Sequence, residues 1–538
     1  MAILFLLSLV THGLLLLNDG TYWDDWLIKS YLANHDWASL HQMTSEMGLP
    51  LFGYFFWGVH ALFGPHGYTV VAFALVTAIS LLIYALLAHS GVGSHAERLA
   101  ISALALTFPA YRTSVLFITL QYLFCYTLFL LTALMVLKAE SWPRLRRASI
   151  RPLALALFFL SFNTNSLLVF YFVFLGYLFY DRIQRLHTPW WTQLQTDLPR
   201  HLDYLILPFV YWTTKLIFFP RHGDYANYNR FDWAISSLWR HLHGFLYWGM
   251  FRPLRNSFDL IALHPLVGVA AFTILALLLR TPRAARVLGS EATPSPRATL
   301  TLMAVLTAIL FAGLFPYIAV GLSPGPDPWD SRFNLLTVFP FAILIVATSR
   351  FIALEPASST TRLSGLLTAR WLLLITLIAA SALRFIAIYI DYEARWVKDR
   401  SVITHLTEMP QLRHFSVIAI KDRMPIPSQP KEDYRWYEWT TMFHEVWGGT
   451  STVGHYADGS PRILRLRRYY TTDFHNDGCN ATLTIAPGPG AGSHTHLAFE
   501  YLFLKYLHPG DLHSFLRTVT ELHYSVTPKA AASCHNTP

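Results

Sequence analysis

Long apolar runs alternate with short polar loops over the first 390 residues of the chain. Many of these runs are roughly 18 to 22 residues long, the length that a helix needs to cross the ~30 Å hydrocarbon core of a bilayer. We therefore predict an α-helical polytopic membrane region at residues 1–390 with about 11 transmembrane helices. The predicted spans are 1–17, 68–88, 99–120, 122–137, 153–180, 204–219, 260–279, 300–320, 333–348 and 371–390.

Two apolar segments depart from this simple pattern. Residues 49–63 are too short to span and contain Pro50, so we predict a helix that lies at the interface or dips into it. Residues 153–180 are long enough to span, but two asparagines interrupt them at 163–165. The pattern there fits one helix or two half-spans that are broken at the asparagines.

The distribution of Lys and Arg predicts the orientation of the membrane region, because cytoplasmic loops carry an excess of these residues. The basic loops, which fall on one side if the spans alternate, are 138–151, 181–203, 280–297 and 350–370. The segments that this places on the outer face are 18–48, 220–259, 321–332 and the polar C-terminal segment.

The composition becomes polar at residue 391, and we predict an extracytoplasmic C-terminal domain at 391–538. About 145 residues are enough to bury a small core. The pattern predicts strands at 415–420 and 481–485 and a helix at 434–446, whereas residues 499–507 are apolar in either state. We therefore expect a small soluble α/β domain.

Composition agrees with a membrane protein. Only 14% of the residues are charged, against about a quarter in average proteins. The net charge of +9 fits basic cytoplasmic loops, so we do not interpret it as nucleic-acid binding. Of the three cysteines, Cys125 lies in an apolar run, whereas Cys479 and Cys534 lie in the tail and can pair only in an oxidising compartment.

Two adjacent carboxylates, Asp24 and Asp25, follow the first apolar segment at the point where a helix should meet water. A carboxylate is costly inside hydrocarbon, and the neighbouring Trp23 and Trp26 are typical of the membrane interface. Two interpretations fit equally well. The stretch is either a solvated loop with aromatic anchors or a catalytic or ion-binding site.

Further polar groups lie on the same predicted face: Arg230 in the loop 220–259, and Asp330 and Arg332 at the start of a span. Such groups can line one cavity between helices. A carboxylate there can act as a general base or hold a divalent metal ion, and the planar fork of arginine suits a phosphate. We therefore predict a lipid phosphate substrate, although an interface residue or a partner of Asp330 explains Arg332 equally well.

Weaker candidates lie nearby. His66 follows the short segment 49–63, and a histidine there is more often an interface residue than a ligand. Arg112 lies near the outer end of its predicted span and either faces the same cavity or anchors the helix. Two tail histidines at 494 and 496 can bind a metal ion, but solvated surface histidines are more common.

This arrangement resembles the GT-C superfamily of polytopic glycosyltransferases, which includes protein O-mannosyltransferases and lipid A aminoarabinose transferases. The shared features are an acidic pair after the first helix, here Asp24-Asp25, and an interfacial segment that begins at 49–55, includes Tyr54 and ends at 62–64. A later match, the Phe-Pro-Tyr triplet at 315–317 followed by Asp330-Ser331-Arg332, resembles a motif of large bacterial membrane families placed near this superfamily. The resemblance covers the topology of the first 390 residues.

The resemblance implies an inverting transfer of a sugar from a polyprenyl-phosphate donor to a hydroxyl of a glycan, lipid or protein acceptor. In that superfamily the acidic residue is a catalytic base or a metal ligand, so Asp24 or Asp25 would deprotonate the acceptor, and a divalent metal ion stays open as a cofactor. Arg332, with Arg112 or Arg230, would bind the leaving phosphate. The expected location is the inner membrane of a bacterium.

The same resemblance makes His66 and Tyr54 substrate-binding candidates, because both belong to or follow the interfacial segment. Two other functions compete with the transferase. A transporter or flippase of a lipid-linked glycan should show mid-membrane charges or internal symmetry, and neither is clear, although Arg384 lies in an apolar run. A non-catalytic scaffold for the external domain predicts that both aspartates can be replaced without loss.

Overall fold

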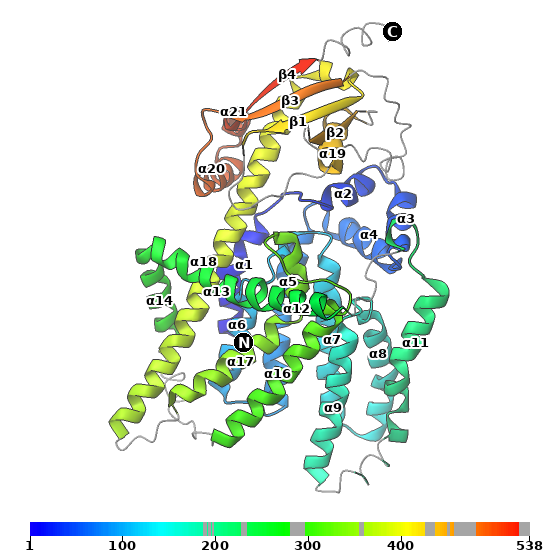
Figure 1. Cartoon of the computed structure of the whole chain (residues 1–538), viewed down its shortest axis with the longest axis vertical. Coiled ribbons are helices and arrows are strands. Elements are labelled where there is room, and N and C mark those ends of the chain that lie inside the picture. The colour runs from blue at the N-terminus through cyan, green and yellow to red at the C-terminus, as the bar shows by residue number, and fades with distance from the viewer. Residues whose placement is uncertain are drawn as a thin grey trace.

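The computed structural model describes residues 1–186, 191, 195, 198–226, 234–279, 296–353, 360–424, 436–448, 452–456 and 480–526. Within these ranges the protein is mostly helical and has one small sheet near the C-terminus. Figure 1 shows the sheet at one end of a bundle of helices, with the long helix α18 joining the two parts. The predicted combination of a helical region and a C-terminal sheet is therefore confirmed.

Three helices of the described residues are long and apolar enough to cross a membrane: α5 (Tyr68–His89), α7 (Leu120–Ala139) and the part Ala369–Thr407 of α18 (Thr360–Thr407). Two further pairs of helices meet the requirements of length and hydropathy only together, and they are bent by 106° and 69° at a break. Several apolar helices can thus span a membrane, but the predicted count of about 11 is not confirmed, because up to five spans are found among the described residues.

Prolines and polar turns divide several of the predicted spans. Residues 99–120 do not form one helix, because α6 (His95–Thr107) ends before Pro109, and proline excludes the residue that precedes it from the helical region. Residues 153–180 are broken at 162–166, between α8 (Arg144–Ser161) and α9 (Leu167–Leu186). Of the two alternatives for that segment, the structure shows the break at the asparagines.

The other helices of the membrane region are short or bent. The predicted interfacial segment is α4, which ends at Gly64, where the backbone φ of +76° favours glycine. A π-helical segment at Phe245–Phe251 joins α12 to α13. The remaining bounds are α1 (Ala2–His12), α2 (Asp25–Ala33), α3 (Trp37–Glu46), α4 (Leu51–Phe63), α11 (Leu202–Phe218), α12 (Ile235–Gly244), α13 (Arg252–Leu263), α14 (Pro265–Leu279), α16 (Pro296–Ile318) and α17 (Val338–Ser349).

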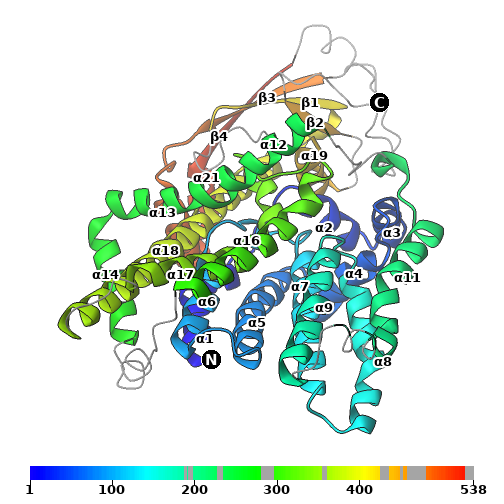
Figure 2. The ribbon, with the colours of Figure 1, turned by 60° about the horizontal axis from the view of Figure 1, so that its bottom comes forward.

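Views from two directions agree on how these helices are placed. In Figures 1 and 2, α8, α9 and α11 form the side of the bundle away from α14 and α18. At the end far from the sheet, Glu140 forms ion pairs with Arg147 of α8 and with Arg182 of α9. Two of the predicted basic loops therefore lie at one end of the bundle. The side of the membrane that this end faces stays a prediction.

Helix α18 connects the bundle to the sheet. Its 48 residues correspond to a length of about 72 Å at 1.5 Å per residue. The predicted domain boundary at residue 390 falls inside this helix, which continues to Thr407. Beyond the boundary its buried side is polar and includes Glu393, Arg395 and Lys398. These charged groups face the elements around the sheet rather than lipid.

The sheet has four strands in the order β2-β1-β3-β4. The three neighbours β2, β1 and β3 are parallel, whereas β4 is antiparallel to β3. Alternate side chains of β3, such as Leu483 and Ile485, are buried, as period-2 alternation requires. The strands are β1 (Val417–Asp422), β2 (Val453–Tyr456), β3 (Asn480–Pro487) and β4 (Thr520–Val526). The helices of this part are α19 (Trp436–Trp447), α20 (His494–Leu507) and α21 (Pro509–Val519).

Both predicted strands and the predicted helix of the C-terminal domain are present as β1, β3 and α19, within a few residues of their expected bounds. The undecided segment 499–507 is helical and belongs to α20. Cys479 and Cys534 lie outside the described residues, so their pairing stays a prediction.

Candidate functional site

A cavity of about 590 Å³ lies among the first acidic loop, the start of α7, the break between α8 and α9, α11 and the end of α16. Its volume is in the range that is typical of ligand sites. The charged side chains that line it are Asp24, Lys215, Arg221 and Arg332. The cavity therefore brings together a carboxylate and three cations from three separate parts of the chain.

The loop that carries Asp24 is fixed by hydrogen bonds from distant helices. Asn18 donates to Glu393 Oε2 of α18 at 2.6 Å, and Tyr68 of α5 donates to the carbonyl oxygen of Gly20 at 2.5 Å. Gly20 is required here, because a Cβ atom would lie 2.0 Å from the hydroxyl oxygen of Tyr22. The loop is thus a rigid part of the fold and not a solvated connection.

Trp23, which precedes the acidic pair, has an unusual backbone. Its φ of 47° lies in the left-handed region, which is strained for a bulky residue. The Trp23 N–H donates to Glu438 Oε2 at 3.2 Å, and the same carboxylate oxygen pairs with Arg395 at 2.5 Å. Both partners of this ion pair are almost fully buried. Strain of this kind is kept only where the surroundings enforce it, and here α18 and α19 do so.

Asp24 itself faces the cavity. Its Oδ1 accepts a hydrogen bond from the Tyr437 hydroxyl of α19, so the segment that follows β1 reaches back to the first loop. The side chain is half-buried. Asp24 is therefore accessible from the cavity and is held by one hydroxyl donor.

Asp25 has a different environment from its neighbour. Its side chain is fully buried and does not line the cavity. The two carboxylate oxygens accept hydrogen bonds from the backbone N–H groups of Phe117 and Ile118, both at 2.8 Å. Burial raises the pKa of Asp25 to about 7, although these hydrogen bonds and the charge of Lys29 oppose the rise. Asp25 thus fastens α2 to the segment before α7.

The position of Arg332 agrees with two of its predicted interpretations, a residue of the cavity and a partner of Asp330. It lines the cavity, and one guanidinium nitrogen lies 3.8 Å from Asp330 Oδ1. The same nitrogen donates to the carbonyl oxygen of Trp329 at 2.9 Å, and the guanidinium lies 4.2 Å from the Trp329 ring centre. Its charge is therefore partly balanced, and its position is fixed before any ligand binds.

A basic wall of the cavity was not found from the sequence. Lys215 of α11 is only 8% exposed, and its ammonium donates to Asn165 Oδ1 at 3.1 Å. No carboxylate of the described residues lies within ion-pair distance of Lys215. Arg221 lines the same cavity and is close enough to repel the charge of Lys215. The sequence signal that could have indicated this wall is the lone lysine inside the apolar run 204–219.

The amide of Gln121 lines the same cavity at the start of α7 and is also notable. Gln121 is only 2% exposed, and its Oε1 has no hydrogen-bond partner within the described part of the chain. Asn163, at the break between α8 and α9, lines the cavity too. A buried amide without a protein partner favours a polar ligand or ordered water at this place.

The other predicted site residues that the structure describes do not line the cavity. Tyr54 is 56% exposed and packs against Trp37, and His66 is exposed as well. The backbone N–H of Arg112 donates to Ser331 Oγ at 3.0 Å, so this segment supports the turn that carries Arg332. Arg230 lies outside the described residues.

A metal ion is not assigned to the site. Among the described residues, no group of three or more His, Cys, Asp or Glu side chains is arranged to hold one. Asp24 and Asp25 are turned to different surroundings, so the pair does not form a shared ligand set. The dependence on a divalent metal ion stays a prediction.

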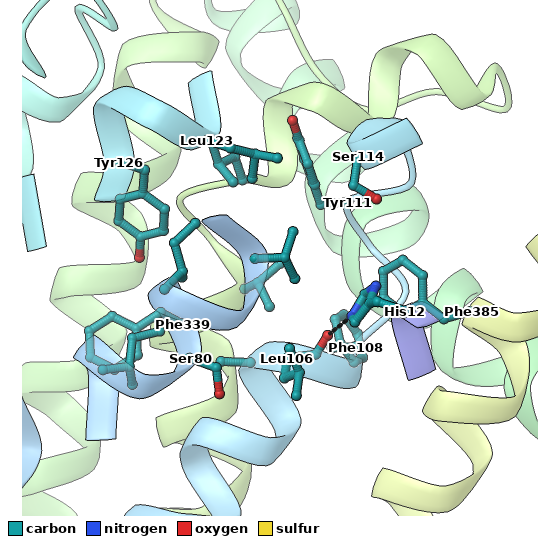
Figure 3. Close-up of a pocket in the computed structure, with 16 residues that line it drawn as sticks. His12, Ser80, Leu106, Phe108, Tyr111, Ser114, Leu123, Tyr126, Phe339 and Phe385 are labelled. Carbon is teal, nitrogen blue, oxygen red and sulfur yellow. Dashed lines mark hydrogen bonds between the residues drawn. The ribbon is translucent and has the colours of Figure 1, made fainter. Parts of the chain in front are cut away.

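A second, smaller cavity of about 50 Å³ lies inside the bundle and is shown in Figure 3. His12 is hydrogen-bonded there to the carbonyl oxygen of Leu106 at 3.0 Å and to the Tyr389 hydroxyl at 2.7 Å. Because the carbonyl only accepts, His12 Nε2 donates to it, and in the neutral ring Nδ1 accepts from Tyr389. These two contacts satisfy both ring nitrogens of His12, and the volume of the cavity is far below that of a typical ligand site, so this cavity is not the candidate site.

The larger cavity therefore has an accessible carboxylate, Asp24, and two neighbouring cations, Lys215 and Arg221, in one lining. Its chemistry must be judged from these residues alone. The chain matches no known protein family, no curated protein and no solved structure.

Proposed function

We propose that the protein is a membrane glycosyltransferase of the GT-C type, which transfers a sugar from a polyprenyl-phosphate donor to an acceptor hydroxyl with inversion. One observation carries the proposal: Asp24, Lys215 and Arg221 line one cavity of the helical bundle. The resemblance of the acidic loop and of residues 315–317 to that superfamily supports it, since Tyr317 also lines the cavity.

Asp24 is the proposed general base. Its carboxylate takes the proton of the acceptor hydroxyl while the acceptor oxygen attacks the anomeric carbon of the donor sugar. The bond between that carbon and the phosphate oxygen breaks, and the bonding electron pair leaves with the polyprenyl phosphate. Attack from the side opposite the leaving group inverts the anomeric centre. Asp25 supports this base only indirectly, because both of its oxygens are engaged by backbone N–H groups.

Lys215 and Arg221 are the proposed binding groups for the donor phosphate. The phosphodiester of the donor carries one negative charge, and the leaving polyprenyl phosphate gains a second when the bond to the sugar breaks, so two cations that repel each other stabilise the leaving phosphate more than the bound donor. Arg332 is less suited to this role than the sequence suggested, because Asp330 already lies 3.8 Å from its guanidinium. We assign to Arg332 and Trp329 the role of a fixed wall beside the donor.

Gln121 and Asn163 are the proposed partners of sugar hydroxyls. Both are amides that line the cavity, and an amide provides a donor and an acceptor to neighbouring hydroxyl groups. The exposed ring of Trp212, which also lines the cavity, places one side of the cavity near the lipid-facing surface of α11. A prenyl chain can leave the cavity on that side.

A transporter of a lipid-linked glycan is the second candidate. The observation in its favour is that two helix pairs are bent at short breaks, one of them at the turn that carries Arg332. Broken helices beside a substrate site are typical of transporters. The two candidates differ in one outcome, because a transferase cleaves its lipid donor and a transporter leaves it intact.

The first test measures binding of undecaprenyl phosphate to the purified protein in lipid nanodiscs by native mass spectrometry, with undecaprenol as the uncharged control. We expect preferential binding of the phosphate and a loss of about tenfold or more in Lys215→Gln, since a charge-assisted contact contributes about 1.5–3 kcal/mol. The matched control is Lys138→Gln, an exposed lysine at the far end of α7. Equal binding of undecaprenol, or no effect of Lys215→Gln, would contradict the proposal.

The second test separates the two candidates. Nanodiscs are loaded with undecaprenyl phosphate that carries a radiolabelled sugar and are mixed with a membrane extract as the acceptor source. A transferase releases free undecaprenyl phosphate and labels an acceptor, and Asp24→Asn abolishes both. Uncleaved lipid that moves between the leaflets of proteoliposomes would support the transporter instead.

A further inference from the structure

Helix α20, which packs beside the sheet, has an apolar stripe that no other element covers among the described residues. The exposed side chains on it are Phe499, Phe503, Tyr506 and Leu507, which are 48–66% exposed. Their spacing of four, three and one residues places them on one face of the helix. The opposite face is buried and includes Leu497, Tyr501 and Leu504. Three aromatic rings and a leucine in one exposed stripe mark an interaction surface.

Polar contacts fix α20 at the end of the first apolar segment. Lys505 pairs with Asp19 at 3.0 Å and donates to the carbonyl oxygen of Leu17 at 3.4 Å. His494 lies 2.9 Å from Asp391 of α18, at the other end of α20. Figure 1 shows α20 at the lower edge of the sheet region, beside α18 and facing the bundle. The stripe is therefore held near the level at which the apolar helices meet water.

The contact between Lys505 and Leu17 also connects the stripe to a lipid-facing surface. Helix α1 exposes Phe5, Leu9 and Val10, which are 45–63% exposed, and this apolar surface continues to Leu17 at 40%. Leu17 is the residue whose carbonyl oxygen accepts from Lys505. The exposed stripe of α20 therefore begins where the exposed apolar surface of the first segment ends.

We propose that α20 is an interfacial anchor, whose stripe lies in the headgroup region of the bilayer on the side of the sheet. Aromatic rings are typical of that depth because they have an apolar body and, in tyrosine, a polar tip. Lys505 lies beside the stripe, where its ammonium can remain at the polar boundary. This inference does not depend on the proposed transfer reaction.

The anchor has a structural consequence for the acidic loop. Asp19, which pairs with Lys505, lies five residues before Asp24 in the same fixed loop. The C-terminal part therefore contacts the bilayer through α20 and contacts the loop through α19, and these two attachments define its orientation. A second copy of the chain is the alternative occupant of the stripe, and the test must distinguish it from lipid.

The test uses a fluorescent NBD label at single cysteines in the full-length protein, reconstituted in nanodiscs with brominated or ordinary phosphatidylcholine. Cys125, Cys479 and Cys534 are first replaced by alanine. The labelled positions are Phe503→Cys in the stripe and His523→Cys on β4, an exposed control whose side chain is 70% exposed. Both positions are on the surface, so neither label needs to disturb the core.

We expect brominated lipid to quench the label at position 503 at least twofold and to leave the label at 523 unchanged. Equal quenching at both positions, or none at 503, would overturn the proposal. A blue-shifted emission at 503 without quenching would mean that protein covers the stripe, and this too would overturn it. As a second measurement, Phe499→Gln with Tyr506→Gln should weaken the quenching at 503, whereas Tyr524→Gln on β4 should not.

Discussion

The two sides of the acidic loop differ more than their sequence suggests. On the cavity side, Asp24 is accessible and accepts one hydrogen bond from Tyr437. On the packed side, Asp25 is fully buried. Each of its carboxylate oxygens accepts a hydrogen bond from a backbone N–H group, with a distance of 2.8 Å between nitrogen and oxygen. Identical residues at adjacent positions thus have different surroundings, which leave Asp24 available for the chemical role that we propose and fix Asp25 as a packing contact.

The difference arises because different segments of the chain contact the two aspartates. Asp25 is the first residue of α2, so its direction follows from the helix, and it meets the segment 113–119. Asp24 follows the strained Trp23, which is held by Glu438 from the C-terminal part. The position of Asp24 therefore depends on contacts between residues that are more than 400 positions apart in the sequence. The position of Asp25 depends on contacts within the helical bundle alone.

The largest expected effect tests the chemical role. Asp24→Asn should reduce sugar transfer by about 10²–10⁴-fold, the range that a general base contributes, and should leave the thermal unfolding temperature unchanged. The measurement is release of undecaprenyl phosphate, alongside a melting curve in detergent. Wild-type transfer by this variant would remove the base hypothesis.

The second effect tests the support of the cavity side. Glu438→Gln removes the charge that faces the buried Arg395, and breaking such a pair costs about 3–5 kcal/mol. We expect a lower unfolding temperature and also slower transfer, because Trp23 loses part of its restraint. The control is the double variant Glu438→Gln with Arg395→Met, which should lose less stability than the two single changes added together. Strict additivity would mean that the two groups do not interact.

The third effect tests the packed side. Asp25→Asn replaces one acceptor oxygen by a donor, so one backbone N–H at 117 or 118 loses its partner at a cost of about 1–3 kcal/mol. The unfolding temperature should fall, while transfer per folded molecule should stay within a few-fold of the wild type. If Asp25→Asn instead kept full stability and lost all transfer, the roles of the two aspartates would be exchanged.

The last effect concerns pH. Because burial raises the pKa of Asp25 to about 7, the folded protein retains a proton that the unfolded chain has lost above its ordinary pKa near 3.8. The free energy of unfolding should therefore fall as the pH rises from about 4 to about 7 and should level off above that range. Melting curves across this window should show a shallower dependence in Asp25→Asn than in the wild type. An unchanged slope would mean that another group titrates there.

The regular parts of this fold were predictable from the sequence, and the reason is local. Helices α5 and α7 follow from apolar length, and strands β1 and β3 follow from short apolar runs bounded by polar residues. The breaks were only partly predictable. Pro109 and the asparagines at 163–165 interrupt the pattern visibly, but a sequence does not state whether such an interruption ends a helix or bends it.

The cavity was only partly predictable for a different reason. The acidic pair and Arg332 were identified, because a charge beside an apolar run is conspicuous. The separate roles of Asp24 and Asp25 were not, since they depend on backbone atoms at 117 and 118. Lys215 was missed among aromatic neighbours, although a lone cation in a membrane run is costly and therefore informative. Tyr54 and His66 were expected beside the substrate and lie away from the cavity.

The contact between Tyr437 and Asp24 also has a consequence for biosynthesis. The two residues are separated by 413 positions, so at about 5–20 residues per second the ribosome needs roughly 20–80 s to make the second after the first. During that interval the first loop lacks the hydroxyl, and Trp23 lacks the carboxylate that restrains it. The first loop of an unfinished chain in the membrane would therefore lack both contacts until synthesis has passed α19.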